Sequence, residues 1–241
     1  MIVHAYILCF NEEATMPFIL DYYSKYCDRI ILIDNESTDG SLEVAKRYPK
    51  VTVFSWTSNN KYDEFKQTYL KQELYKKYST GLADWVIVVD GDEVIYGLED
   101  LENLKNNKVL LPNIEGYHMV SRDFPVYDGG CITSKVQYGI RMPHMDKQSV
   151  FSPSVDIKFG LGMHTFTCET AERNYSFPAL KLLHYKYLGL DFWIKRLRTS
   201  SGVNNSRLID SYGDIGSHLR CTDAVVKEEF DGFFTKLKKI I

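Results

Sequence analysis

The chain of 241 residues contains the stretch Trp85-Val86-Ile87-Val88-Val89-Asp90-Gly91-Asp92-Glu93. Its first five residues are apolar on both faces of an extended segment, which is typical of a central strand in a parallel sheet. The strand ends on Asp90, where two carboxylates flank a glycine. Ligands of open α/β sheets bind beyond the carboxyl ends of the strands. We therefore expect a ligand site directly after this strand.

The residues before this stretch alternate between strand and helix patterns. Extended apolar runs cover 2–10, 30–33 and 51–56. Helical patterns cover 11–27 and 62–78. Asn11 is the expected cap of the first helix, with Glu12 and Glu13 at the positive end of its dipole. The apolar positions of the second helix are Phe65, Tyr69, Leu70, Leu74 and Tyr78. This alternation predicts βαβ units and a mostly parallel sheet.

The character of the sequence changes after residue 98. Short strand patterns cover 109–112, 117–121, 135–141 and 179–184. Helical patterns follow at about 190–200 and 222–241. Neither an internal repeat nor a linker is visible, so we expect one domain over residues 1–241.

Composition excludes several classes of protein. The net charge of −3 and the lack of a basic arm argue against a nucleic-acid partner. The five cysteines show no CxxC spacing and fit free thiols in a reducing compartment; they are Cys9, Cys27, Cys131, Cys168 and Cys221. The amino terminus lacks the basic region of a signal peptide, and no apolar stretch is long enough to span a membrane. We expect a cytoplasmic protein.

Three predicted strands end in polar clusters. These clusters are Asn11-Glu12, Asp34-Asn35-Glu36-Ser37 and Asp90-Gly91-Asp92-Glu93. Neither GxGxxG nor GxxxxGK[ST] occurs, so the dinucleotide fingerprint and the P-loop are both absent. Paired carboxylates around a glycine suit Mg²⁺ or Mn²⁺ together with phosphate oxygens. An ordinary acidic turn is the alternative interpretation of the third cluster.

These motifs together resemble the family 2 glycosyltransferases. The resemblance rests on Asn11-Glu12-Glu13, Ile33 through Ser41, Asp84-Trp85, Asp90 through Glu93, Gly162-Met163-His164 and Leu183-His184-Tyr185-Lys186. It points to a branch with a DxDE motif that is associated with surface polysaccharide and lipopolysaccharide synthesis. It implies an A-type glycosyltransferase fold, which is α/β and Rossmann-like. That fold has a mostly parallel central sheet with helices on both faces and a smaller acceptor-side sheet.

The resemblance also implies a division of the domain and a set of roles. Residues 1–98 would bind the nucleotide, about 99–205 would face the acceptor, and about 206–241 would form a helical tail. The implied nucleotide-binding residues are Phe10, Asn11, Glu12, Asp34, Asn35, Asp90 and Gly91. Asp92 would ligate the metal, with Asp90 facing the ribose and the water shell of the metal. Capping and turn chemistry is the alternative role of Asn11 and Asp34, and both roles can coexist.

Two histidines compete for a further metal position. His184 follows an apolar strand, and A-type transferases often take a metal ligand from a late histidine. If His184 is that ligand, its side chain should point toward Asp92, and a nearby acceptor should hold its other ring nitrogen. His164 lies in a glycine-flanked loop and could replace His184 at the metal or contact the acceptor.

The catalytic base is harder to identify. An inverting transferase, which we expect here, usually needs a carboxylate base for the acceptor hydroxyl. The chain lacks a clear Glu-Asp pair at the expected place, so Asp156 and Asp123 are the candidates and the stereochemistry stays open. Lys147 and Arg141 could neutralise the diphosphate as it departs.

The predicted last helix has one broad apolar face, with Lys236, Lys238 and Lys239 in its final turn. Core packing explains that face, and contact with an anionic membrane is the alternative. We expect transfer of a sugar from a nucleoside diphosphate sugar to a hydroxyl of a bacterial surface glycan or a lipid-linked glycan. A sugar nucleotidyltransferase and a non-catalytic binding protein with the transferase fold are the alternatives.

Overall fold

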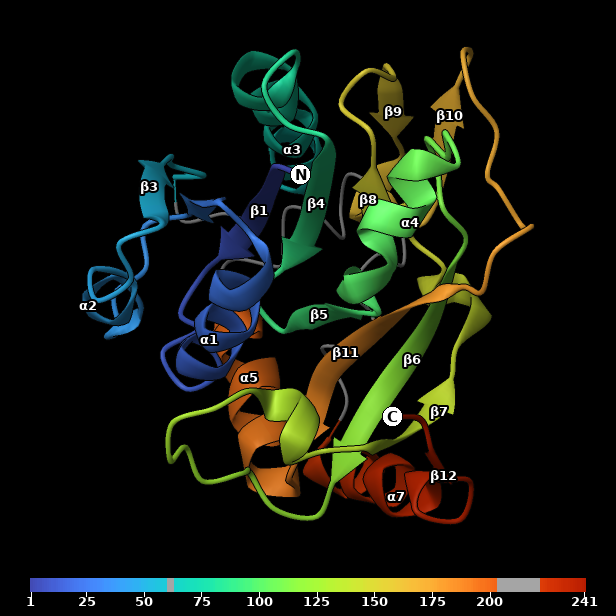
Figure 1. Cartoon of the computed structure of the whole chain (residues 1–241). Helices are drawn as coiled ribbons and strands as arrows, with labels where there is room; N and C mark the ends of the chain where they lie inside the picture. The colour runs from blue at the N-terminus through green and yellow to red at the C-terminus, as the bar shows by residue number, and fades with distance from the viewer. Residues whose placement is uncertain (60–62, 203–221) are drawn as a thin grey trace.

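The computed structural model describes residues 1–59, 63–202 and 222–241 (Figure 1). Its first sheet has five strands in the order β3-β2-β1-β4-β8. They are β1 (Val3–Cys9), β2 (Arg29–Asp34), β3 (Val51–Ser55), β4 (Trp85–Asp90) and β8 (Val150–Phe151). The first four pair in parallel, and β8 lies antiparallel to β4. The predicted parallel sheet is confirmed, with the apolar strand β4 inside it.

Helices cover both faces of this sheet. On one face lie α1 (Met16–Tyr26) and α2 (Ser41–Ala45), and on the other lies α3 (Glu64–Ser79). Alternate residues of β1 belong to the two hydrophobic clusters, since Ala5 and Ile7 pack toward α1 whereas Tyr6 packs toward α3. A strand buried on both faces in this way has no polar alternation, which explains the continuous apolar runs in the sequence.

A second sheet also has five strands, in the order β12-β7-β6-β11-β5. They are β5 (Glu93–Tyr96), β6 (Ile114–Ser121), β7 (Tyr138–Arg141), β11 (Leu180–Leu188) and β12 (Lys238–Lys239). This sheet therefore has as many strands as the first, whereas we expected a smaller one. Because β5 follows β4 after only Gly91 and Asp92, the chain passes from one sheet to the other at the acidic motif (Figure 1). One hydrophobic cluster spans both sheets.

The remaining elements complete the part of the chain after β5. The longer ones are α4 (Leu101–Asn106), α5 (Leu190–Gly202) and α7 (Asp223–Phe233), with β9 (Ile157–Phe159) paired to β10 (Phe166–Cys168). Single 3₁₀ turns lie at Leu98–Asp100, Ile132–Ser134, Pro143–Met145 and Leu161–Met163. Val226 and Phe230 of α7 pack against Trp193 of α5. Within the described ranges, no helix combines the length and the apolar composition that crossing a bilayer requires.

The first helix begins later than predicted, at Met16 and not after Asn11. Asn11 has a φ of 54°, which is a left-handed conformation incompatible with a helix cap. The chain makes a turn first, in which Thr15 and Met16 donate their backbone N–H groups to the carbonyl of Glu12. The two acidic residues therefore lie in a loop at the end of β1.

The inward face of α3 also differs from its predicted apolar face. Phe65 and Tyr69 are 49% and 61% exposed, whereas Gln67 and Lys71 are buried. The helix is rotated so that Lys71 faces the end of β4. Leu74 packs inward as its spacing indicates.

Two further predictions are wrong in part. The segment 109–112 forms only an isolated bridge between Pro112 and Asn174, because proline has no N–H for a ladder. The last helix ends at Phe233, and Lys238 and Lys239 form β12 against β7, so they do not cap a helix. The cysteines within the described residues are free, as predicted, and Cys221 lies outside those residues.

Candidate active site

The carboxyl ends of β1, β2 and β4 meet at one edge of the first sheet. Cys9 pairs with Asp34 on one side of β1, and Leu8 pairs with Asp90 on the other. Gly91 fits tightly here, since a Cβ on it would lie 2.9 Å from Cγ of Glu12 and 3.0 Å from the carbonyl oxygen of Leu8. Any other residue at 91 would push the loop after β1 away from the acidic motif.

Hydrogen bonds join the loop after β1 to the loop after β2. Oδ1 of Asn11 accepts the backbone N–H of Thr38 at 2.8 Å and that of Asp39 at 3.3 Å. In return, the backbone N–H of Asn11 donates to Oγ of Ser37 at 3.0 Å, and that of Glu12 donates to Oγ of Ser41 at 2.8 Å. These bonds hold the two loops in register along the edge of the sheet.

The other predicted nucleotide-binding residues lie along the same edge. Asp34 is buried and accepts the backbone N–H of Ser37 at 3.3 Å with both oxygens. Oδ1 of Asn35 accepts the N–H of Ser58 at 3.2 Å, and Phe10 is half-buried. The structure thus gives Asn11, Asp34 and Asn35 a part in holding loops, and their contact with a nucleotide stays a prediction.

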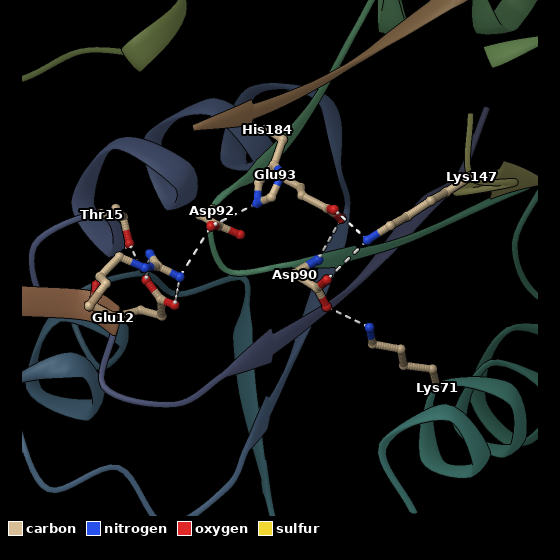
Figure 2. A network of polar contacts seen from close by, with 9 residues as sticks. Glu12, Thr15, Lys71, Asp90, Asp92, Glu93, Lys147 and His184 are labelled. Carbon is tan, nitrogen blue, oxygen red and sulfur yellow. Dashed lines mark hydrogen bonds and ion pairs between the residues drawn. The ribbon is translucent and has the colours of Figure 1, made fainter. Parts of the chain in front are cut away.

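The end of β4 carries a network of ion pairs in which most of the side chains are buried and Asp90 is one third exposed (Figure 2). Asp90 contacts Nζ of Lys71 at 2.5 Å and Nζ of Lys147 at 3.2 Å, and Lys147 also reaches Glu93 at 2.6 Å. Glu93 in turn accepts the backbone N–H of Asp90 at 3.0 Å. Burial alone would raise the pKa of Asp90, but Lys71 and Lys147 hold it well below its usual value.

A second arm of the network surrounds Asp92. Its Oδ2 lies 3.1 Å from Nε2 of His184 and 3.1 Å from a guanidinium nitrogen of Arg196. Arg196 also donates a hydrogen bond to each oxygen of Glu12, both at 2.8 Å, and the hydroxyl of Thr15 donates to Glu12 at 2.7 Å. Burial would raise the pKa of Asp92, but Arg196 and His184 keep it well below its usual value. Burial raises the pKa of Glu12 to about 7, with Asp92 adding to the effect and Arg196 opposing it.

Within the described residues this network contains more negative than positive groups. Its four carboxylates belong to Glu12, Asp90, Asp92 and Glu93. Its three permanent cations belong to Lys71, Lys147 and Arg196. Burial is the main cause of the raised pKa of Glu12, and the neighbouring charge of Asp92 adds to it.

Asp92 and His184 suit a divalent metal as a pair. Two ligands bound to one octahedral ion at about 2.1 Å and at right angles lie about 3 Å apart, and Oδ2 of Asp92 is 3.1 Å from Nε2 of His184. No cluster of three or more His, Cys, Asp or Glu residues suited to a metal occurs in the described ranges, so water and substrate oxygens would have to supply the other ligands. Nδ1 of His184 is buried with no hydrogen-bond partner there, so the expected acceptor is missing.

His164 faces a different group. Its Nδ1 lies 2.8 Å from the carbonyl oxygen of His144, and because a carbonyl only accepts, Nδ1 carries the proton. Its Nε2 and Oε1 of Glu64 would both lie 3.0 Å from a Cβ on Gly162, so the two groups lie on the same side of this glycine. Burial raises the pKa of half-buried Glu64. Of the two candidate histidines, the structure thus brings His184 to Asp92.

The candidates for catalytic base and phosphate binding lie elsewhere. Asp156 is 62% exposed and pairs with Lys76 at 2.6 Å, beyond Lys71 along α3. Asp123 is exposed beside Gly189, at the start of α5. Arg141 pairs with Asp146 at 2.7 Å. Of these four predicted residues, only Lys147 belongs to the network, where it contacts carboxylates.

The sequence analysis missed several members of the site. Lys71 and Arg196 have no motif around them, and each was part of an ordinary helical pattern. Glu93 was quoted in the acidic motif without a role. Lys71 gave no signal of burial, since it lies outside the predicted apolar face of its helix. Nothing in the sequence indicated that Arg196, 104 residues after Asp92, would reach it.

Comparison with known proteins identifies the first part of the chain. Residues 5–107 match the model of glycosyl transferase family 2. This segment is family 2-like. The matched residues run from Ala5 within β1 through β5, and they include the segments that carry Glu12, Asp34 and Asp92. An uncharacterized glycosyltransferase of Rickettsia typhi is 30% identical over 92 residues, which are 38% of this chain and 28% of the relative.

Solved structures resemble the chain more distantly. Glucosyl-3-phosphoglycerate synthase from Mycobacterium tuberculosis, solved with Mn²⁺, UDP and glucosyl-3-phosphoglycerate, is 17% identical with a TM-score of 0.32. The match covers 48% of this chain and 44% of that protein. Another mycobacterial protein is 16% identical with a TM-score of 0.33, over 48% of this chain and 41% of its own length. The chain thus spans less than half the length of these relatives.

Proposed function

We propose that the protein transfers a sugar from a nucleoside diphosphate sugar to a hydroxyl group. The observation that carries this proposal is the family 2 match over residues 5–107, together with the strand-end edge that the same residues form. The nucleotide would lie across the ends of β1 and β2, near Asp34 and Asn35. The diphosphate would lie at Asp92, where the chain passes between its two sheets.

Asp92 and His184 are the residues that we propose as ligands of Mg²⁺ or Mn²⁺. A divalent cation there would supply Lewis-acid stabilisation of the departing diphosphate. Asp90 takes a different part, because Lys71 and Lys147 already neutralise it. In this position Asp90 and its two lysines join the end of β4 to α3 and to the segment before β8.

Glu64 is the carboxylate that we propose as the base for the acceptor hydroxyl. It is half-buried at the first turn of α3, and the described residues give it no ion pair. Burial raises its pKa, which makes it a stronger proton acceptor than an exposed carboxylate. Asp156 lacks both properties, since it is exposed and the pKa of its carboxyl is lowered by Lys76. We also propose that transfer inverts the anomeric carbon. The proposed acceptor is a bacterial surface glycan or a lipid-linked glycan.

Calorimetry tests the donor and metal parts of this proposal. UDP and GDP are titrated into the wild-type protein with and without Mn²⁺, and into D92A and H184A. We expect binding that needs the metal and that falls at least tenfold in both variants, whereas D156A binds as the wild type does. Metal-dependent binding that is unchanged in D92A would refute the metal assignment.

A turnover assay separates the proposed enzyme from its alternatives. A panel of sugar nucleotides is incubated with the protein and Mn²⁺, and release of the nucleoside diphosphate is measured. Slow donor hydrolysis supports a transferase. Pyrophosphate formation from a nucleoside triphosphate and a sugar phosphate would indicate a nucleotidyltransferase instead, and neither binding nor turnover would indicate a non-catalytic protein.

A further inference from the structure

Arg196 lies in α5, far beyond the family-matched residues 5–107, yet its guanidinium group reaches the centre of the site. Two of its nitrogens contact the two oxygens of Glu12 at 2.8 Å. The side chain is 26% exposed, compared with 10% for Glu12 and 5% for Asp92. A bidentate pair with this burial fixes the orientation of the arginine.

Arg196 and His184 share a single oxygen of Asp92. Both contact Oδ2, each at 3.1 Å. Oδ2 is the oxygen of Asp92 that faces His184. A cation bound by both Asp92 and His184 would therefore contact this oxygen. A divalent ion and a guanidinium group at the same oxygen would repel each other strongly in this buried setting. Arginine cannot relieve the conflict by losing its proton, so it must move.

We propose that Arg196 is an internal counter-ion of Asp92 that yields this carboxylate to the divalent cation and then contacts the diphosphate of the donor. The inference rests on the proposed function and adds a residue to it. The bidentate ion pair between Glu12 and Arg196 persists throughout, so the guanidinium group stays at the site after it leaves Asp92. Its released N–H groups are donors of the kind that bind phosphate oxygens.

This exchange has two opposite consequences for binding. Without nucleotide, Arg196 competes with the cation for Asp92 and weakens metal binding. With nucleotide, Arg196 gains phosphate oxygens in place of the carboxylate, so metal and nucleotide strengthen each other's binding. Loss of the arginine should therefore increase the affinity for the metal in the absence of nucleotide. It should also weaken the coupling between metal binding and nucleotide binding. Loss of an arginine with a purely structural role would weaken the binding of the metal and of the nucleotide alike, so it would produce neither effect.

The test uses Mn²⁺ alone as the first probe. Free Mn²⁺ is measured by electron paramagnetic resonance in titrations of wild type and R196M without nucleotide. We expect R196M to bind Mn²⁺ about tenfold more tightly than wild type. R173M is the matched control, since Arg173 donates to Gln148 and to the carbonyl of Asp146 outside the network, and it should bind Mn²⁺ as wild type does. Unchanged or weaker Mn²⁺ binding by R196M would overturn the inference.

The second probe is UDP or GDP, whichever the wild-type protein binds. The factor by which Mn²⁺ increases nucleotide affinity is measured by calorimetry, and we expect it to fall at least tenfold in R196M. An unchanged factor overturns the inference. If wild type binds no Mn²⁺ in either titration, the proposed metal site fails as well, and this outcome is distinct from failure in the R196M comparison alone.

R196K provides a second variant in case R196M does not fold. Lysine keeps the charge but cannot make the bidentate pair with Glu12 that fixes the orientation of Arg196, so Mn²⁺ affinity should lie between those of wild type and a protein without the cation. The double variant E12Q/R196M removes the buried carboxylate that R196M leaves unpaired, and it should bind Mn²⁺ more tightly than E12Q does. If Mn²⁺ binds the double variant no more tightly than it binds E12Q, the competition does not exist.

Discussion

The loops after β1 and β2 and the end of β4 lie side by side on one sheet edge, but different forces hold them. The two loops are joined by hydrogen bonds in which side chains of Asn11, Ser37 and Ser41 accept backbone N–H groups. The bonded residues are fewer than about 30 positions apart in the sequence. The end of β4 is held instead by buried ion pairs to Lys71, Lys147, His184 and Arg196, which come from four separate segments. The first region is built locally, and the second depends on the whole fold.

This difference predicts different sensitivities to mutation. Breaking a buried ion pair leaves an uncompensated charge, whereas losing one hydrogen bond to the backbone costs about 1 kcal/mol. The ion-pair network at the end of β4, which includes Glu12 through the shared Arg196, should therefore be both the more fragile part of the site and the part that responds to pH and to cations.

The largest effect is expected from K147M. This change leaves Glu93, which is 1% exposed, without its lysine. We expect the free energy of unfolding to fall by about 3–5 kcal/mol, measured by urea denaturation. K46M is the control, because the pair of Lys46 with Glu43 is more than 60% exposed at both side chains, and such pairs contribute below about 1 kcal/mol. Equal losses in the two variants would remove the contrast between the regions.

A smaller effect is expected from the pH dependence of Glu12. Its pKa in the folded protein is raised to about 7 from 4.5, chiefly by burial, so the folded state holds its proton more tightly than the unfolded chain. The stability that this proton gives is present below pH 4.5 and is lost as the pH rises to about 7. Relative to E12Q, wild type should lose up to about 1.4 kcal/mol of unfolding free energy per pH unit in this window.

Urea denaturation at pH 5, 6 and 7 measures this slope. Comparing wild type with E12Q is necessary, because burial lowers the pKa of His118 to about 2 and also lowers that of His144, which adds stability as the pH rises. These histidines are common to both proteins and cancel in the difference. E43Q, at an exposed position, should show the wild-type profile. Parallel profiles for wild type and E12Q would contradict the prediction.

The hydrogen bonds of Asn11 should contribute less to stability, and their contribution should not depend on pH. N11A removes the acceptor of the N–H groups of Thr38 and Asp39 and places alanine at a φ of 54°. We expect a loss of about 1–3 kcal/mol in thermal or urea unfolding. N11G tolerates the left-handed backbone and should lose less, which separates the hydrogen bonds from the strain. If N11G is the less stable variant, the backbone conformation contributes nothing.

The smallest effect is expected from D156A. Its exposed carboxylate pairs with Lys76, and it lies outside both regions. The unfolding midpoint and the Mn²⁺-dependent nucleotide affinity should equal those of wild type. A large loss of donor turnover in D156A, with E64Q remaining active, would return the role of base to Asp156 and refute Glu64.

The sequence by itself determined the first sheet and the position of its ligand edge. The apolar run from Trp85 to Val89 predicts a buried central strand, and the carboxyl ends of parallel strands coincide, so Glu12, Asp34 and Asp92 had to lie near one another. These are consequences of local patterns and of strand direction, which a sequence carries directly.

Only the tertiary structure decided what those carboxylates face. Lys71 turns inward against the apolar pattern of α3, and Arg196 arrives from a helix of the other half of the chain. The reason is physical: a buried carboxylate needs a counter-charge within a few ångströms, but the need can be met from any segment that the fold brings near. The sequence shows that Asp90 and Asp92 require counter-charges. Only the packing of the folded chain determines which residues supply them.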